Sequence, residues 1–164
     1  MIVYLVRHAW AEDANAAKWP DDGQRPLTED GRQRFSKAVK TLVDRGLAPQ
    51  SIVTSPLVRC RQTAEILAKH TPGRPALIER KELAPGSDLD GLIEWTCKQA
   101  PRCEEVAWVG HAPDVNQMAA SLIGDETAHV RFAKGAVAAI RFEGPPEIGG
   151  GELCWLATAK LLGC

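Results

Sequence analysis

The sequence predicts an α/β fold of three layers, in which a mainly parallel β-sheet lies between helices. Short apolar runs rich in β-branched residues alternate with longer amphipathic stretches, which is the pattern of strands that alternate with helices. Near the C-terminus two apolar runs follow each other without a helix, so we expect an antiparallel strand there. We expect one domain over residues 1–164, because chains usually divide only beyond roughly 250 residues.

The first half of the chain predicts two strands and two helices. The chain is expected to begin with a strand at 2–6, followed by a long polar loop at 9–26 and a helix between Thr28 and Gly46. A strand at 51–54 and a helix from Ser55 to about His70 follow. Thr28 has a side chain suited to the N-cap of a helix, and Gly46 is suited to its end. Ser55 followed by Pro56 predicts a second N-cap with proline in the first helical position.

The second half continues the alternation and then departs from it. The expected elements are a strand at 76–78, a helix capped by Ser87, a strand at 106–109, a helix from Pro113 to near Gly124, and strands at 136–142 and 153–157. The last two strands are joined by the Gly/Pro-rich stretch at 143–151, which predicts a hairpin loop.

Composition argues against several classes of partner and location. The chain has 20 basic and 21 acidic residues, and this net charge of −1 predicts no bulk attraction to nucleic acid or to an anionic membrane. The N-terminal apolar run ends at Arg7, which is too short for a secretory signal or a membrane span. The 5 cysteines include no CxxC pair and indicate neither a disulfide framework nor a zinc site. We therefore expect a cytoplasmic protein.

Charged or titratable residues directly follow three of the predicted strands. They are Arg7 and His8 after the first strand, Arg59 after the second, and His111 after the strand at 106–109. The carboxyl ends of parallel strands meet at one edge of a sheet, so these side chains are expected to share a cleft. Arginine donates paired hydrogen bonds to phosphate or carboxylate oxygens. The sequence therefore predicts an anion-binding site.

Two histidines in the same cleft indicate chemistry beyond binding. Neighbouring cations disfavour protonation, so His8 is expected to stay neutral and available as a nucleophile. Attack on phosphorus would produce a phosphohistidine, with His111 and the arginines stabilising charge on the transferring oxygens. A metal site is the competing use of the two histidines. However, Arg7 and Arg59 would repel a divalent cation, so we expect neither a metal nor another cofactor.

Five segments together carry a family resemblance. They are LVRHA at 5–9, RPLTEDG at 25–31, SPLVRCRQTAEIL at 55–67, ELAPG at 82–86 and VGHAPDV at 109–115. In this order, over residues 1 to about 142, they resemble the histidine phosphatase superfamily, and within it the short SixA-type phosphohistidine phosphatases. The resemblance implies a phosphoglycerate mutase-like fold and a hydrolase with a role in signal transduction.

The resemblance also implies roles for single residues. His8 would be the nucleophile, Arg7 and Arg59 would hold the phosphoryl oxygens, and His111 would complete the pocket, with Arg25 at its rim.

Glu82 stands where larger members carry a carboxylate proton donor. Two roles remain open for it, proton donation or structural pairing with Arg7 or Arg59. The first motif reads RHA, with Ala9 where RHG is common in the superfamily. In the loop beside the proposed cleft, Trp10 and Trp19 are expected to form an aromatic wall.

The predicted function is that of a monomeric, metal-independent phosphatase that acts on a phosphohistidine side chain of another protein. A phosphatase of small phosphomonoesters is one alternative, and it would need a working proton donor. A phosphate-binding module without turnover is another, although pure binding would require neither His8 nor His111. A phosphoryl transferase of the mutase kind is a weaker third, because the chain is short for the insertions that enclose a substrate.

Overall fold

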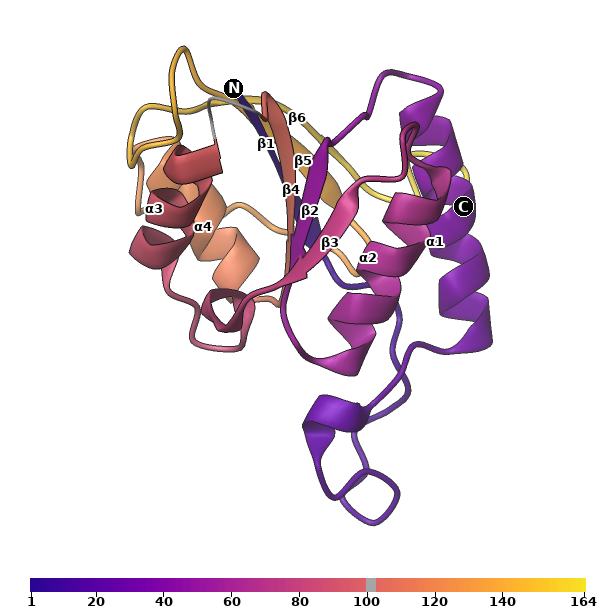
Figure 1. Cartoon of the computed structure of the whole chain (residues 1–164). Coiled ribbons are helices and arrows are strands. Elements are labelled where there is room, and N and C mark those ends of the chain that lie inside the picture. The colour runs from indigo at the N-terminus through magenta and orange to yellow at the C-terminus, as the bar shows by residue number, and fades with distance from the viewer. Residues whose placement is uncertain (100–102) are drawn as a thin grey trace.

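A computed structural model describes residues 1–99 and 103–164 and places one mixed β-sheet between helices (Figure 1). The strands are β1 (Ile2–Arg7), β2 (Ser51–Thr54), β3 (Ala76–Glu79), β4 (Glu105–Gly110), β5 (Val137–Arg141) and β6 (Glu152–Ala157). The α-helices are α1 (Glu29–Val43), α2 (Val58–His70), α3 (Leu89–Gln99) and α4 (Asp114–Leu122). Two short 3-10 helices are η1 (Asp22–Gln24) and η2 (Lys81–Leu83).

The strand order in the sheet is β3-β2-β4-β1-β5-β6. The strands β3, β2, β4 and β1 are parallel, whereas β5 runs antiparallel to β1 and β6 runs antiparallel to β5. The prediction of a mainly parallel sheet with an antiparallel strand near the C-terminus is therefore confirmed.

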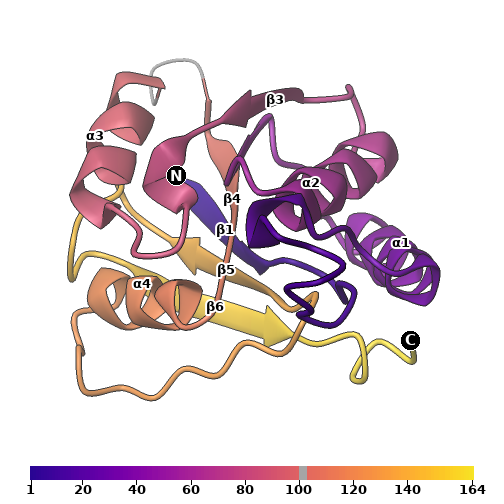
Figure 2. The same ribbon diagram turned by 90° about the horizontal axis from the view of Figure 1, so that it is seen from below.

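The helices cover both faces of the sheet and bury a core on each. Helices α1 and α2 lie on one face of the sheet, and α3 and α4 lie on the other (Figure 2). Phe35 and Leu67 belong to the core on the first face, and Leu92 and Met118 belong to the core on the second. Burial of each such side chain contributes about 1.5–3 kcal/mol to folding. The predicted three-layer arrangement is confirmed.

The start of α1 agrees with the sequence, because the Thr28 hydroxyl accepts a hydrogen bond from the Gly31 amide at 3.0 Å. The predicted cap of α2 is wrong. This helix begins at Val58 after Leu57, which makes no side-chain cap hydrogen bond. Ser55 lies too early in the chain to cap the first turn, and its hydroxyl is turned to another partner, described below.

The predicted cap of α3 is wrong by one residue. Asp88 directly precedes the helix, and its Oδ1 accepts from the Gly91 amide at 2.9 Å. From this position its carboxylate reaches the third residue of the helix, which is the geometry of an N-cap that the sequence had assigned to Ser87.

The parallel strands end together and so determine where the site lies. In the register of the sheet Arg7 pairs with Gly110, and Thr54 pairs with Val109. The residues that follow these strands therefore lie at one edge of the sheet, which Figure 2 views from below. The segment that carries η1 extends beyond this edge in Figure 1. In the described part of the chain, none of the helices has both the length and the apolar character that a bilayer span requires.

Candidate active site

A cavity of about 520 Å³ lies at the carboxyl edge of the sheet. Its lining consists of Arg7, His8, Arg25, Arg59, Pro85, Gly86, His111, Ala112, Pro113, Asp114 and Lys134. The chain folds so that residues far apart in sequence meet here, as the junctions between strands and helices predicted. Of the catalytic and phosphate-binding residues proposed from the sequence, Glu82 is missing from this lining, and so are the two tryptophans expected to form a wall.

His8 is buried directly after β1. Its Nδ1 lies 2.8 Å from the carbonyl oxygen of Ala9, so Nδ1 carries the proton and donates it, and Nε2 keeps a lone pair. Burial lowers the pKa of His8 to about 4; the hydrogen bond to Ala9 opposes this shift, and the charges of Arg59 and Arg7 add to it. His8 is therefore neutral at pH 7. The sequence argument attributed this to the arginines, but burial is the larger cause.

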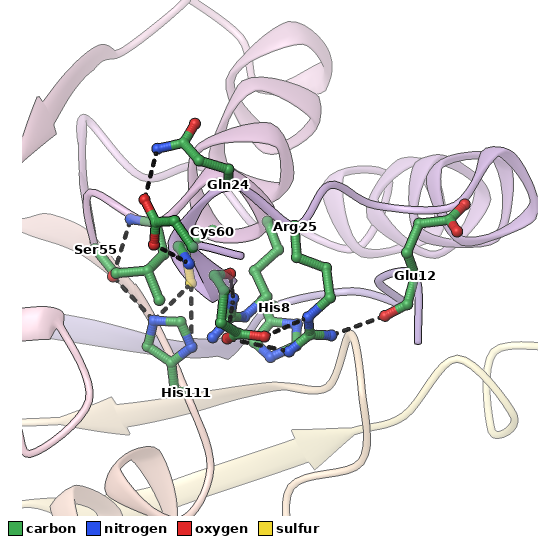
Figure 3. A network of polar contacts seen from close by, with 12 residues as sticks. His8, Glu12, Gln24, Arg25, Ser55, Cys60 and His111 are labelled. Atoms are coloured by element: carbon green, nitrogen blue, oxygen red, sulfur yellow. Dashed lines mark hydrogen bonds and ion pairs between the residues drawn. The ribbon is translucent and has the colours of Figure 1, made fainter. Parts of the chain in front are cut away.

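His111 is a second neutral imidazole beside it. The centroids of the two rings are 5.3 Å apart. Burial lowers the pKa of His111 to about 3, and the positive charge of Arg59 contributes in the same direction. Its Nε2 lies 2.9 Å from the Ser55 hydroxyl and 3.4 Å from the Cys60 sulfur (Figure 3).

Arg7, which is half-buried, and Arg59, which is buried, bring two guanidinium groups to the same cavity. Nη1 of Arg7 donates to the carbonyl of Phe132 at 2.7 Å, and Nη1 of Arg59 donates to the carbonyl of Asp22 at 2.9 Å. Among the described residues, the buried Nε of each arginine has no hydrogen-bond partner. A buried donor without an acceptor costs about 1–3 kcal/mol, so the pocket is suited to an anion that accepts from both groups.

Asp22 is a component of the site that the sequence analysis missed. Its carboxylate accepts from Arg25 Nε at 2.7 Å and lies 3.1 Å from Arg59 Nη1. The hydrogen bond from Arg25 holds the pKa of Asp22 below its usual value, since it outweighs the opposing effect of burial. Nη1 of Arg25 donates to the backbone carbonyl of Glu12 at 2.8 Å. Arg25 thus lies at the rim, as expected, but much of its guanidinium is bound by the protein.

Glu82 pairs with neither Arg7 nor Arg59. Its carboxylate instead receives two hydrogen bonds from Arg80, one of them at 3.1 Å. Burial raises the pKa of Glu82, but hydrogen bonds from its own backbone and from Arg80 outweigh this effect, and the net pKa is lowered. The two roles predicted for Glu82 came from its place in the ELAPG segment. Arg80, two residues earlier in the sequence, is the signal that could have predicted the observed ion pair.

The expected aromatic wall is also wrong. Neither Trp10 nor Trp19 contributes to the lining of the cavity. The guanidinium of Arg34 lies 4.1 Å from the centroid of the Trp10 ring, and Lys18 lies 5.1 Å from that of Trp19. The face of each ring is therefore in contact with a nearby cation, on α1 for Trp10 and on the loop itself for Trp19, in a cation–π arrangement.

Comparison with protein families shows which superfamily the chain belongs to. The family model described as histidine phosphatase superfamily, branch 1, matches residues 3–138. The chain belongs to the histidine phosphatase superfamily. Membership of this superfamily supports a phosphatase, and the matched range contains the whole of the cavity lining.

One similar sequence and two similar solved structures add to the family match. An uncharacterized protein from Picosynechococcus sp. is 37% identical over 131 residues, covering 79% of this chain and 77% of that protein. The structure of the protein histidine phosphatase SixA complexed with tungstate has a TM-score of 0.85 at 23% identity and covers 99% of both chains. A phosphoserine phosphatase mutant from Entamoeba histolytica, in complex with phosphoserine, has a TM-score of 0.68 at 14% identity and covers 98% of both. The structural matches confirm the phosphoglycerate mutase-like fold and its likeness to SixA.

Proposed function

We propose that this member of the superfamily is a phosphohistidine phosphatase that uses His8 as its nucleophile and a phosphohistidine side chain of another protein as its substrate. The observation that carries the proposal is the state of His8. It is a neutral ring whose Nδ1 proton is held by the Ala9 carbonyl, with its Nε2 lone pair left for reaction. It lines a cavity beside two guanidinium groups whose Nε atoms have no hydrogen-bond partner within residues 1–99 and 103–164.

In the first step His8 Nε2 forms a bond to phosphorus while the bond from phosphorus to the substrate imidazole breaks. The electron pair of the broken bond goes to the departing nitrogen. An imidazole protonated on its other nitrogen leaves as a neutral molecule, so this step needs no further acid. Arg7, Arg59 and His111 stabilise the charge on the phosphoryl oxygens, which is the main task of a protein in phosphoryl transfer.

In the second step water attacks the phosphorus of phospho-His8. A bond from oxygen to phosphorus forms, the bond from nitrogen to phosphorus breaks, and its electron pair returns to Nε2. The proton released by the water ends on the phosphate. The Ala9 carbonyl holds the ring in the same orientation in both steps, since its hydrogen bond involves only Nδ1.

One observation favours a second candidate, a phosphatase of small phosphomonoesters. An alkoxide is a poor leaving group and needs a proton donor. Asp114 lines the cavity with a nearly buried carboxylate, and its Oδ2 accepts from the Gly86 amide at 3.0 Å. We favour the phosphohistidine substrate because Glu82, in the place of the usual donor, is bound by Arg80. We further propose that the protein acts as a cytoplasmic monomer in signal transduction; its nearly balanced charge argues only against a polyanionic partner.

The experiment is a turnover assay with a phosphohistidine-bearing protein and a panel of phosphomonoesters, combined with brief labelling by radioactive substrate. The wild-type chain is expected to release phosphate and to carry acid-labile, base-stable label. His8→Ala should lose both, whereas His129→Ala, which alters an exposed histidine outside the cavity, should retain both. Label recovered on His8→Ala would refute the nucleophile, and turnover of phosphomonoesters alone would favour the second candidate.

A further inference from the structure

Ser55 is a fully buried residue whose hydroxyl the proposed mechanism does not yet use. It follows β2 directly, and its side chain does not cap α2. Its Oγ lies 2.9 Å from His111 Nε2, and the amide of Leu57 points to the same oxygen at 3.4 Å. A hydroxyl has one proton to donate, and the amide already supplies a donor to its oxygen. Two acceptors lie near that proton, His111 Nε2 and the Cys60 sulfur, and the imidazole nitrogen at 2.9 Å is the stronger of the two.

The position of the single ring proton decides what His111 can do. His111 is neutral at pH 7, so only one of its nitrogens carries hydrogen. Figure 3 shows Nε2 turned to Ser55 and the other ring nitrogen, Nδ1, on the side of His8, with the Cys60 sulfur 3.9 Å from Nδ1. With the proton on Nδ1, His111 presents a donor to a group bound near His8. With the proton on Nε2, it presents a lone pair that repels phosphoryl oxygens.

Cys60 is the other neighbour of His111 Nε2, and its sulfur lies 3.4 Å from that nitrogen. Burial raises the pKa of this thiol to about 12, so the sulfur keeps its proton. The thiol hydrogen is directed to the Gly110 carbonyl at 3.5 Å. A thiol is also a weak hydrogen-bonding group compared with a hydroxyl. Ser55 is therefore the stronger of the two partners in fixing the state of the ring.

We propose that Ser55 is a positioning residue, whose hydroxyl donates to His111 Nε2 and so keeps the ring proton on Nδ1, where it serves a phosphoryl oxygen. Ser55 acts through His111 and touches no reacting atom. The catalytic consequence rests on the proposed function, but the tautomer of His111 in the free protein does not.

The first test is nitrogen NMR of the histidine rings at neutral pH, in which the chemical shifts of the two ring nitrogens report which one is protonated. Wild type is expected to show His111 protonated on Nδ1. Ser55→Ala should move a large share of the population to the Nε2-protonated form, and Ser55→Thr, which keeps the hydroxyl, should restore the original form. Thr71→Val is the matched control, because it removes another buried hydroxyl at the far end of α2.

Two results would overturn the proposal at this stage. One is a wild-type His111 protonated on Nε2, and the other is an unchanged tautomer in Ser55→Ala. Cys60→Ala provides a further check that is independent of the Ser55 variants. It removes the sulfur and keeps the hydroxyl, so the Nδ1-protonated form should persist.

The second test is kinetic. Outright loss of one donor to the transferring group costs about 100- to 1,000-fold in kcat. Ser55→Ala is expected to lower kcat less, about 10- to 100-fold, because part of the His111 population keeps its Nδ1 proton, and to change KM by a smaller factor. Ser55→Thr should recover most of the loss, and Thr71→Val should resemble wild type. An unchanged kcat in a folded Ser55→Ala would refute the catalytic part. If wild type itself releases no phosphate from any substrate, the proposed function fails, while the NMR result still decides the role of Ser55.

Discussion

The inner pocket and the rim of the cavity use similar side chains but hold them in different ways. The inner pocket, defined as Arg7, His8, Arg59 and His111, follows strand ends or lies on α2, and each arginine and His8 binds a backbone carbonyl. The rim is defined here as Arg25, which lines the cavity, together with Asp22 and Glu82, which lie outside the lining, and it is held mainly by ion pairs between side chains.

This difference indicates how easily evolution or mutation can alter each part. Backbone carbonyls cannot be removed by substitution, so Arg7, His8 and Arg59 keep these contacts when neighbouring side chains change. The ring of His111 is the exception, because its partner is the side chain of Ser55. The carboxylate of Asp22 is 55% exposed. Exposed ion pairs contribute about 0–1 kcal/mol and are weakened by salt. We therefore expect large effects from inner-pocket substitutions and modest effects from rim substitutions.

The largest effect in this comparison is expected for Arg59→Ala. The substitution removes a buried guanidinium that holds phosphoryl oxygens in the proposed mechanism, so kcat/KM should fall on the order of a hundredfold to a thousandfold. Arg61→Ala is the matched control on the same helix, because Arg61 is exposed and pairs with Glu79 at 3.1 Å. Steady-state kinetics with a phosphohistidine substrate measures both. Equal and small losses would mean that the inner pocket does not bind the phosphoryl group.

The second prediction concerns the pH dependence of stability. Each inner histidine has a lower pKa in the folded state than in the unfolded chain, so its protonation favours unfolding. The stabilisation from the neutral rings is complete above pH 6.5 and is lost as the pH falls towards 4. For His8 this corresponds to at most about 3 kcal/mol, since its pKa falls from 6.5 to about 4.

Urea unfolding between pH 4 and 8 measures this dependence. Wild type should lose stability below pH 6.5, and a variant with both His8 and His111 replaced by Asn should show a much flatter profile. The rim behaves differently, because the pKa of Asp22 is lowered and its pairing with Arg25 persists until the pH is below its usual value of 3.8. A steep profile that survives the double replacement would place the acid sensitivity elsewhere.

The inner pocket could be predicted from the sequence and most of the rim could not, for a physical reason. Arg7 ends β1, His8 and His111 follow β1 and β4, and parallel strands place their carboxyl ends at one edge whatever the loops do. Arg59 follows by the same reasoning, because it lies in the first turn of the helix after β2. The roles of these residues in catalysis stay predictions.

The rim depends on loop conformation, which short-range patterns determine less well. Asp22 lies three residues before Arg25 in η1, a spacing that could have suggested their ion pair. Its second partner, Arg59, is distant in sequence and could not have been inferred. The sequence predicted Ser55 as a helix cap because Pro56 follows it. Only the tertiary structure shows that its hydroxyl lies within hydrogen-bond distance of His111.

The third prediction uses neighbouring carboxylates of the rim. Asp22→Asn removes the charge that aligns Arg59 and Arg25, so kcat/KM should fall about 3- to 10-fold, as expected for the loss of roughly 1 kcal/mol. Asp21→Asn is the control, because the side chain of Asp21 accepts from the Gly23 amide and an asparagine oxygen can do the same. The loss in Asp22→Asn should shrink at high salt, where the wild-type pair is itself weakened. A loss as large as that of Arg59→Ala would remove the distinction between rim and inner pocket.

The smallest effect is expected for Glu82→Gln with a phosphohistidine substrate. The carboxylate is bound by Arg80 outside the cavity lining, and a departing neutral imidazole needs no acid, so kcat should change by less than about threefold. Asp114→Asn gives the informative contrast, since Asp114 does line the cavity. With a phosphomonoester, whose alkoxide must be protonated, a working donor is worth about 100-fold or more. If Glu82→Gln shows that loss and Asp114→Asn does not, Glu82 reaches the leaving group after all. A rim carboxylate would then take part in the chemistry, and the boundary between inner pocket and rim would have to be redrawn.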